Sequence, residues 1–129
     1  MKALTIWQPY AQAIALGLKK FETRSWPTKH RGKIAIHASV KSLSKELKIL
    51  ADRYNITNAS FGKIIVVADL TDCILITEDF IKTQPQSELD LGNWYIGNYA
   101  WKLEHIQILI PPQKATGKQG LWNWEEPKK

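Results

Sequence analysis

The segment Gly17-Leu18-Lys19-Lys20-Phe21-Glu22-Thr23-Arg24-Ser25-Trp26 gathers two lysines, a carboxylate, an arginine and an indole into ten positions. As a β-strand it would send alternate residues to opposite faces, with Lys20, Glu22, Arg24 and Trp26 on one and Lys19, Phe21, Thr23 and Ser25 on the other. A half-buried strand ordinarily has one clearly apolar face. Because both faces carry polar groups here, we expect part of this strand to line a cleft.

The composition predicts a small soluble protein. The chain has 129 residues, 44% of them hydrophobic, which predicts a single domain over residues 1–129. No apolar run reaches the length that spans a membrane, and the first residues lead straight into periodic structure without a secretion signal. The single cysteine, Cys73, excludes an internal disulfide and a cysteine-rich zinc site. We therefore expect a cytoplasmic protein that does not associate with membranes.

The charge balance favours anionic partners. Eighteen Lys and Arg residues against twelve Asp and Glu residues give a net charge of +6, which suits a nucleic acid, a nucleotide or a phosphate-bearing metabolite. Six tryptophans are many for a chain of this length. Each can fill core volume, and one or two in a cleft could stack on a base.

The hydrophobic periodicity predicts many strands and few helices. We expect strands at 2–7, 33–38, 61–76, 94–104, 106–110 and 121–124, separated at Pro111-Pro112 and elsewhere by turns. Helices are expected from Pro9 to the glycine stop at Gly17, from a cap at Ser39 or Ser42 to about Tyr54, and from Thr77 to Lys82. Residues 84–92 are expected to form a loop that could act as a flap. This pattern is typical of an α+β, mainly β, domain: a small β-barrel with short helices outside it.

Several phrases of the sequence resemble one family in the right order. They are Leu4-Thr5-Ile6-Trp7-Gln8-Pro9-Tyr10, Gly17-x-Lys19-x-x-Glu22-x-Arg24-x-Trp26, Arg31-Gly32-Lys33-Ile34-Ala35-Ile36-His37-Ala38, Gly62-Lys63-Ile64 leading to Asp69-Leu70-Thr71-Asp72-Cys73, Tyr99-Ala100-Trp101-Lys102-Leu103 and Gly117-Lys118-Gln119-Gly120-Leu121-Trp122. Together they resemble the ASCH domain, the activating-signal-cointegrator homology module of the PUA-like superfamily. The resemblance covers nearly the whole chain.

This resemblance implies a PUA-like β-barrel with a basic cleft beside the Gly17-x-Lys19-x-x-Glu22-x-Arg24 element, and recognition of RNA or of a modified nucleoside or nucleotide. Some bacterial members are similar to amidohydrolases that remove the acyl group of N4-acetylcytidine, and others are ribonucleases. The amidohydrolases pair a lysine and a threonine of this element with an acid on a later strand. Lys19 matches the lysine and Asp69 lies where the acid should fall, but Glu22 stands in place of the threonine. Thr23 is one residue away and should face the other side.

The candidate catalytic residues are therefore Lys19, Glu22 and Asp69, and each has a structural alternative. Lys19 is either a solvated lysine or a cleft residue that meets phosphate or carbonyl oxygen and serves as a base after desolvation. Glu22 and Arg24 either pair with each other or contact ligand directly. Asp69 shares an alternation position with Ile65 and Val67. It either bonds backbone amides at a strand end or works as the acid or base paired with Lys19.

The candidate ligand-binding residues combine the same element with aromatic and basic groups. Trp26 shares a face with Glu22, and Arg31 sits in a basic turn that suits phosphate. His37 lacks a second ligand at metal spacing, so we expect no metal and no cofactor. The full set is Gln8, Lys19, Glu22, Arg24, Trp26, Arg31, His37 and Trp101.

Binding of RNA or a nucleotide-like small molecule is the leading functional hypothesis. The alternatives are a small amidohydrolase acting on an acylated base, or a ribonuclease. A hydrogen-bonded pair of Lys19 and Asp69 in a closed pocket would favour chemistry, whereas an open basic groove would favour binding. A protein partner is a third possibility, which an exposed apolar patch of Trp94, Trp101 or Trp122 would support.

Overall fold

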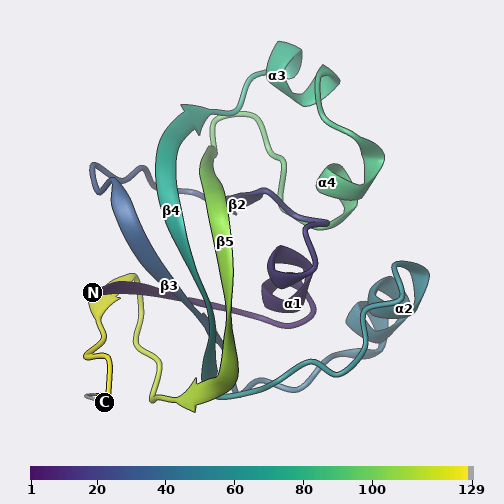
Figure 1. Ribbon diagram of the computed structural model, residues 1–129. Helices are drawn as coiled ribbons and strands as arrows, with labels where there is room; N and C mark the ends of the chain where they lie inside the picture. Colours follow the sequence, from purple (N-terminus) through teal and green to yellow (C-terminus); the bar gives the residue numbers. More distant parts are fainter. Residues whose placement is uncertain (128–129) are drawn as a thin grey trace.

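The computed structural model describes residues 1–127 and contains one curved six-stranded sheet with four short helices in that range (Figure 1). The strands are β1 (Lys2–Ile6), β2 (Phe21–Arg24), β3 (Gly32–Ala38), β4 (Lys63–Leu75), β5 (Tyr99–Lys114) and β6 (Leu121–Asn123). The helices are α1 (Tyr10–Ala15), α2 (Lys45–Arg53), α3 (Glu78–Lys82) and α4 (Gln86–Asp90). The fold is mainly β, a half-barrel with flanking helices, as the sequence predicted.

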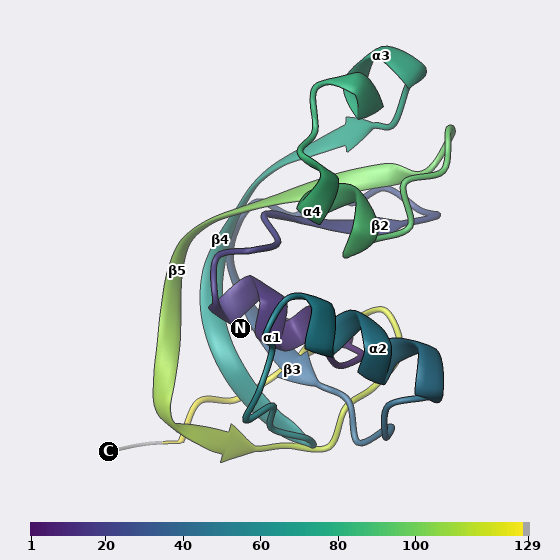
Figure 2. The same cartoon turned by 90° about the vertical axis from the view of Figure 1, so that its right-hand side faces the viewer.

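The strand order is β2-β5-β4-β3-β1-β6, in which β1 and β3 run parallel and every other pair is antiparallel. The two long strands β4 and β5 form the spine of the sheet and bend together through it (Figure 2). Their register shifts at three places, between Ile64 and Val66, Val67 and Asp69, and Leu70 and Asp72. Such irregularities bend and twist a ladder, which explains how one sheet curls into a half-barrel.

The prediction of two strands, 94–104 and 106–110, ended by the prolines was wrong in its boundaries. One strand, β5, starts at Tyr99 and continues through Pro111-Pro112 to Lys114. The prolines are tolerated because they lie in the irregular stretch between the Val66–Ile108 and Ile64–Gln113 pairs. His105 absorbs another irregularity with a positive φ of 53°.

The main core lies between the concave face of the sheet and α1 (Figure 2). Ala11 and Ile14 of the helix pack against Leu4, Ile36 and other buried strand residues. Gly17 follows the helix with a φ of 78°, so the predicted glycine stop is confirmed.

The segment 84–92, expected to be a loop, contains the short helix α4. Its Glu88 is only 2% exposed because the helix packs against the start of β2.

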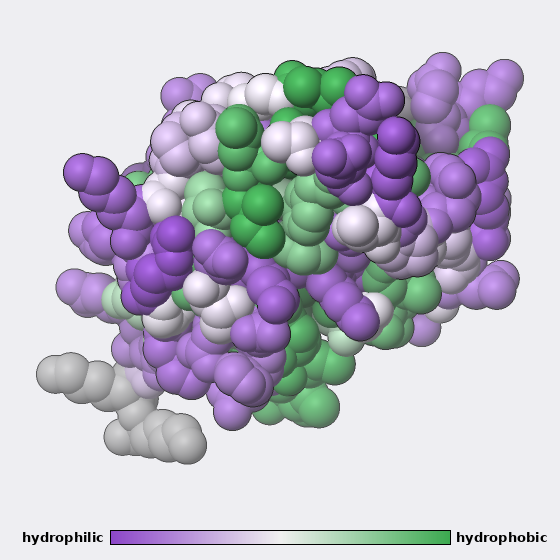
Figure 3. Space-filling view, turned by 90° about the horizontal axis from the view of Figure 1, so that it is seen from above, coloured by the Kyte–Doolittle hydropathy of each residue, from purple (hydrophilic) through white to green (hydrophobic). Residues whose placement is uncertain are grey.

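Within the described residues, no helix is long and apolar enough to cross a membrane. The face shown in Figure 3 carries a strip of hydrophobic residues bordered by hydrophilic ones.

Candidate functional site

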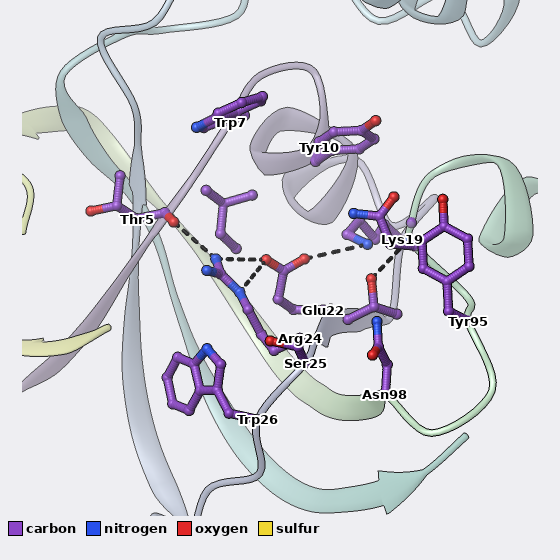
Figure 4. A pocket seen from close by; sticks show the side chains of 14 residues that line it. Thr5, Trp7, Tyr10, Lys19, Glu22, Arg24, Ser25, Trp26, Tyr95 and Asn98 are labelled. Carbon is purple, nitrogen blue, oxygen red and sulfur yellow. Dashed lines mark hydrogen bonds and ion pairs between the residues drawn. The ribbon is translucent and has the colours of Figure 1, made fainter. Parts of the chain in front are cut away.

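A cavity of about 410 Å³ opens where the end of β1, the start of α1, β2 and the loop before β5 meet (Figure 4). β1 and β2 are not neighbours in the sheet, but the curvature of the sheet brings them together. The contact between them is a hydrogen bond from Arg24 Nη2 to the Thr5 carbonyl, at 2.9 Å. The lining residues are Thr5, Ile6, Trp7, Tyr10, Lys19, Glu22, Thr23, Arg24, Ser25, Trp26, Gly92, Asn93, Tyr95 and Asn98.

Three charged side chains form a row across this cavity. Lys19 Nζ lies 3.5 Å from Glu22 Oε1, and Arg24 approaches Glu22 Oε2 with Nη2 at 2.8 Å and Nε at 3.0 Å. The expectation that a regular strand would turn Lys19 away from Glu22 was wrong. β2 begins only at Phe21, so strand alternation does not govern Lys19. Glu22 therefore sits between two cations at the base of the cavity (Figure 4).

Lys19 is 1% exposed and is held by the loop after α4. Its ammonium donates to the Leu91 carbonyl at 2.6 Å. The next residue, Gly92, leaves room for it, since a β-carbon there would lie 3.2 Å from Nζ and 3.0 Å from the Trp94 indole nitrogen. Burial lowers the pKa of Lys19 below its ordinary value, while the neighbouring Glu22 acts in the opposite direction.

Glu88, which lies outside the cavity lining, holds the backbone at the start of β2 in place. Its carboxylate accepts from the backbone N–H of Lys20 at 2.8 Å and of Phe21 at 3.3 Å. Its carbonyl accepts from the Trp94 indole at 2.8 Å. Burial raises the pKa of the Glu88 carboxyl, against the effect of these N–H groups and of Lys19. Glu88 thus sets the backbone from which Lys19 reaches the cavity.

Aromatic side chains surround the charged row. Trp7 and Tyr10 lie on one side of Glu22 in Figure 4, Trp26 on the other, and Tyr95 beside Lys19. Trp7 and Tyr95 are 48% and 67% exposed, so they form the rim. Tyr10 lies deeper, where burial and the charge of Glu22 raise the pKa of its phenol.

Comparison with known proteins agrees with this architecture. The family model of the ASCH domain matches residues 4–113, a range that contains every residue lining the cavity. The chain belongs to the ASCH domain family. Human activating signal cointegrator 1 is 32% identical over 81 residues, which is 55% of this chain but 14% of that protein. The crystal structure of ASCH from Zymomonas mobilis has a TM-score of 0.62 at 17% identity and covers 97% of this chain and 87% of its own.

Not all predicted site residues of this ASCH domain reach the cavity. Lys19, Glu22, Arg24 and Trp26 line it together. Trp101 lies behind it, fully buried. Its ring meets that of Trp26 edge-on at a centroid distance of 4.8 Å, so it supports the wall.

Asp69 does not meet Lys19. It bonds His105 Nδ1 at 2.9 Å and lies outside the cavity lining. The alternation expected for Ile65, Val67 and Asp69 fails at Ile65, because β4 carries this extra residue between its Ile64–His37 and Val66–Ile36 pairs with β3. Ile65 therefore packs with Val66 in the main core, whereas Asp69 shares the opposite face with Val67, which belongs to a second hydrophobic cluster. The Lys19–Asp69 pair that would favour hydrolysis is therefore absent from the described residues.

Three other candidates lie outside the cavity lining and have structural partners. Gln8 is buried, accepts from Gln12 N–H and donates to the Ser60 carbonyl. His37 lies between the Thr5 hydroxyl, 3.1 Å from Nδ1, and the Ala115 carbonyl, 2.7 Å from Nε2. Arg31 is exposed and donates to carbonyls of its own turn. No group of metal-ligating side chains occurs within residues 1–127.

Sequence reasoning missed several lining residues. Thr23 was expected to face away, but it lines the cavity and its hydroxyl accepts from Asn93 N–H at 2.8 Å. Asn93, Tyr95 and Asn98 come from a loop that no local pattern connects to β2. Trp7 and Tyr10 stand within the Leu4–Tyr10 phrase that carried the family resemblance, which is the signal that could have found them.

Proposed function

We propose that this ASCH domain binds a nucleobase, presented by RNA or by a free nucleoside or nucleotide, in the cavity around Lys19, Glu22 and Arg24. The observation that carries the proposal is a row of three charged groups, two of them buried, with aromatic rings around it. Rings supply stacking surfaces that accept any base, and charged groups supply hydrogen bonds to its edge or phosphate.

The charges of the cavity suit an anionic guest. Two cations, Lys19 and Arg24, flank one carboxylate, so the row carries a formal charge of +1, and the whole chain carries +6. Arg24 is the most accessible of the three, with 25% of its side chain exposed. Its bonds to Glu22 and Thr5 hold the guanidinium in place, which favours binding of a planar ligand.

Titration of the protein with short single-stranded RNA and with nucleoside monophosphates, followed by tryptophan fluorescence, tests this function. RNA binding should weaken between about 50 mM and about 200 mM salt, because phosphate contacts release counterions. Arg24→Met should weaken binding about 10-fold, corresponding to about 1.4 kcal/mol.

Lys33→Met is the matched control, since it removes the same charge from an exposed lysine that lines a different cavity. It should change affinity less than about 2-fold, well under about 1.4 kcal/mol. Equal losses in both variants would place RNA elsewhere on the surface, and no binding at low salt would remove the proposed function altogether.

Hydrolysis of an acylated base such as N4-acetylcytidine is a second candidate, favoured by one observation. The buried Lys19 amine has a lowered pKa and faces the cavity, as a base that activates water would require. Lys19 would take a proton from water as its oxygen adds to the acyl carbon and would return that proton to N4 as the C–N bond breaks, releasing cytidine and acetate.

Incubation with N4-acetylcytidine measures this directly, with Lys19→Met as the variant. Release of cytidine by the native protein but not by the variant is expected for the hydrolase, whereas equal release or none excludes Lys19 chemistry. The same incubation with RNA would reveal a ribonuclease by the appearance of shorter fragments.

A protein partner has less support. Trp101 is fully buried, Trp122 is 8% exposed and Trp94 is only partly exposed, so these residues do not form the exposed patch that would have supported a protein partner.

A further inference from the structure

The three charged groups of the row present hydrogen-bond donors and acceptors in a fixed order. Lys19 contributes an N–H donor at one end, the Glu22 carboxylate an acceptor in the middle, and the Arg24 guanidinium N–H donors at the other end (Figure 4). A ligand edge that satisfies this order must present acceptor, donor and acceptor in sequence.

Each of the three groups has capacity left for a ligand. Arg24 uses Nε and Nη2 on Glu22 and Thr5, while its Nη1 has no hydrogen-bond partner among residues 1–127. Lys19 has three N–H groups, and one of them is committed at 2.6 Å to the Leu91 carbonyl.

Among residues 1–127, Glu22 Oε1 meets only Lys19, at 3.5 Å, which is longer than an ordinary N–H···O bond. Oε2, in contrast, already accepts twice from Arg24. Oε1 is therefore the atom that can take a proton donor from a guest.

Among the four bases of RNA, only uracil presents the complementary edge. Its imide offers O4 as acceptor, N3–H as donor and O2 as acceptor. Cytosine offers a donor and two acceptors, guanine an acceptor and two donors, and adenine a donor and an acceptor. A cytosine in the same position would turn its unprotonated N3 toward the Glu22 carboxylate, leaving two acceptors face to face.

We propose that the cavity selects uracil-type bases by their imide edge, with N3–H donating to Glu22 and the two carbonyl oxygens accepting from Lys19 and Arg24. This inference rests on the proposed function, since it assumes that a base enters the cavity. The aromatic side chains hold the ring whatever the base, and the charged row supplies the selectivity.

Titration of the native protein with uridine, cytidine and N3-methyluridine 5′-monophosphates tests the selectivity, because all three carry the same phosphate and ribose. Uridine monophosphate should bind about 10- to 100-fold more tightly than the other two, the range of one good set of base-edge contacts. N3-methylation removes only the donor and blocks its approach to Glu22. Dihydrouridine monophosphate, which keeps the imide but loses the aromatic ring, should retain the preference over cytidine.

Glu22→Gln gives a second, independent readout. The amide oxygen should stay with Arg24, so the amide nitrogen turns to the guest and replaces the acceptor by a donor. The variant should therefore lose the preference for uridine monophosphate and should favour cytidine monophosphate instead.

The outcomes separate the two proposals. If cytidine or N3-methyluridine monophosphate binds as tightly as uridine monophosphate, imide recognition is wrong while base binding stands. If no monophosphate and no RNA binds, both fall. The comparison of ligands uses the native protein, so a folding defect in Glu22→Gln leaves the test decisive.

Discussion

Replacing Glu88 by alanine should lower the free energy of unfolding by about 3 kcal/mol, although the residue lies outside the cavity lining. The carboxylate accepts two backbone N–H groups, from Lys20 at 2.8 Å and Phe21 at 3.3 Å. Removing the carboxylate leaves both of these backbone N–H groups without their acceptor, and a buried unsatisfied donor costs roughly 1–3 kcal/mol. The longer bond, to Phe21 N–H, contributes near the lower end of this range. Removing the carboxylate also removes the free-energy cost of burying it, which offsets part of the summed loss.

Thermal and urea unfolding, followed by circular dichroism at neutral pH, measure this change. An unfolding entropy of about 2.1 cal/mol/K per residue over 129 residues gives about 270 cal/mol/K, so a loss of 3 kcal/mol corresponds to a melting temperature about 11 °C lower.

Glu78→Ala is the matched control. Glu78 is 75% exposed on its side chain and forms an i,i+4 pair with Lys82 at 3.7 Å, so its loss should cost no more than about 0.5 kcal/mol. If the two variants unfold within about 1 kcal/mol of each other, Glu88 does not hold the start of β2 and the account of how Lys19 is positioned fails.

Three further outcomes follow from the same contacts. The free energy of unfolding of the native protein should exceed that of Glu88→Gln by its full amount below the ordinary carboxyl pKa. This difference should shrink as pH rises through the raised pKa of Glu88, and urea titrations at several pH values measure it. Gly92→Ala should destabilise the fold by roughly 1–3 kcal/mol in urea unfolding, since its β-carbon would crowd Lys19 Nζ and the Trp94 indole. Asp69→Asn should leave ligand affinity within about 2-fold in the fluorescence titration, because Asp69 pairs with His105 outside the cavity; a 10-fold loss there would restore it to the site.

Local rules predicted much of the fold correctly. Gly17 ends α1 with a positive φ, and the apolar run in residues 64–68 lies buried in β4, as its composition indicates. Where a strand is interrupted, the same rules failed. A proline pair normally ends a strand, yet β5 accommodates Pro111-Pro112 because its partner β4 shifts register at that level.

The site was only partly predictable for a related reason. Glu22, Arg24 and Trp26 are close in sequence, so their spacing placed them together. Glu88, in contrast, lies 68 residues from the backbone N–H of Lys20 that it accepts from, in a polar segment with a proline that reads as a loop. Its burial results from tertiary packing, which no local pattern encodes. The irregularity at Ile65, which broke the alternation expected to lead to Asp69, is likewise a property of two paired strands and not of one sequence.

The charged row is hard to explain as a device for stability. Taking a lysine to 1% exposure beside a carboxylate carries a desolvation cost that its ion pair offsets only in part, as the lowered pKa of Lys19 indicates. Well-packed apolar residues in such positions are often neutral or stabilising. The fold nevertheless supports the row from three directions, through Leu91, Glu88 and Thr5, and leaves room for the amine at Gly92. Groups that are costly to bury yet held so firmly are expected where charge is kept ready for a ligand.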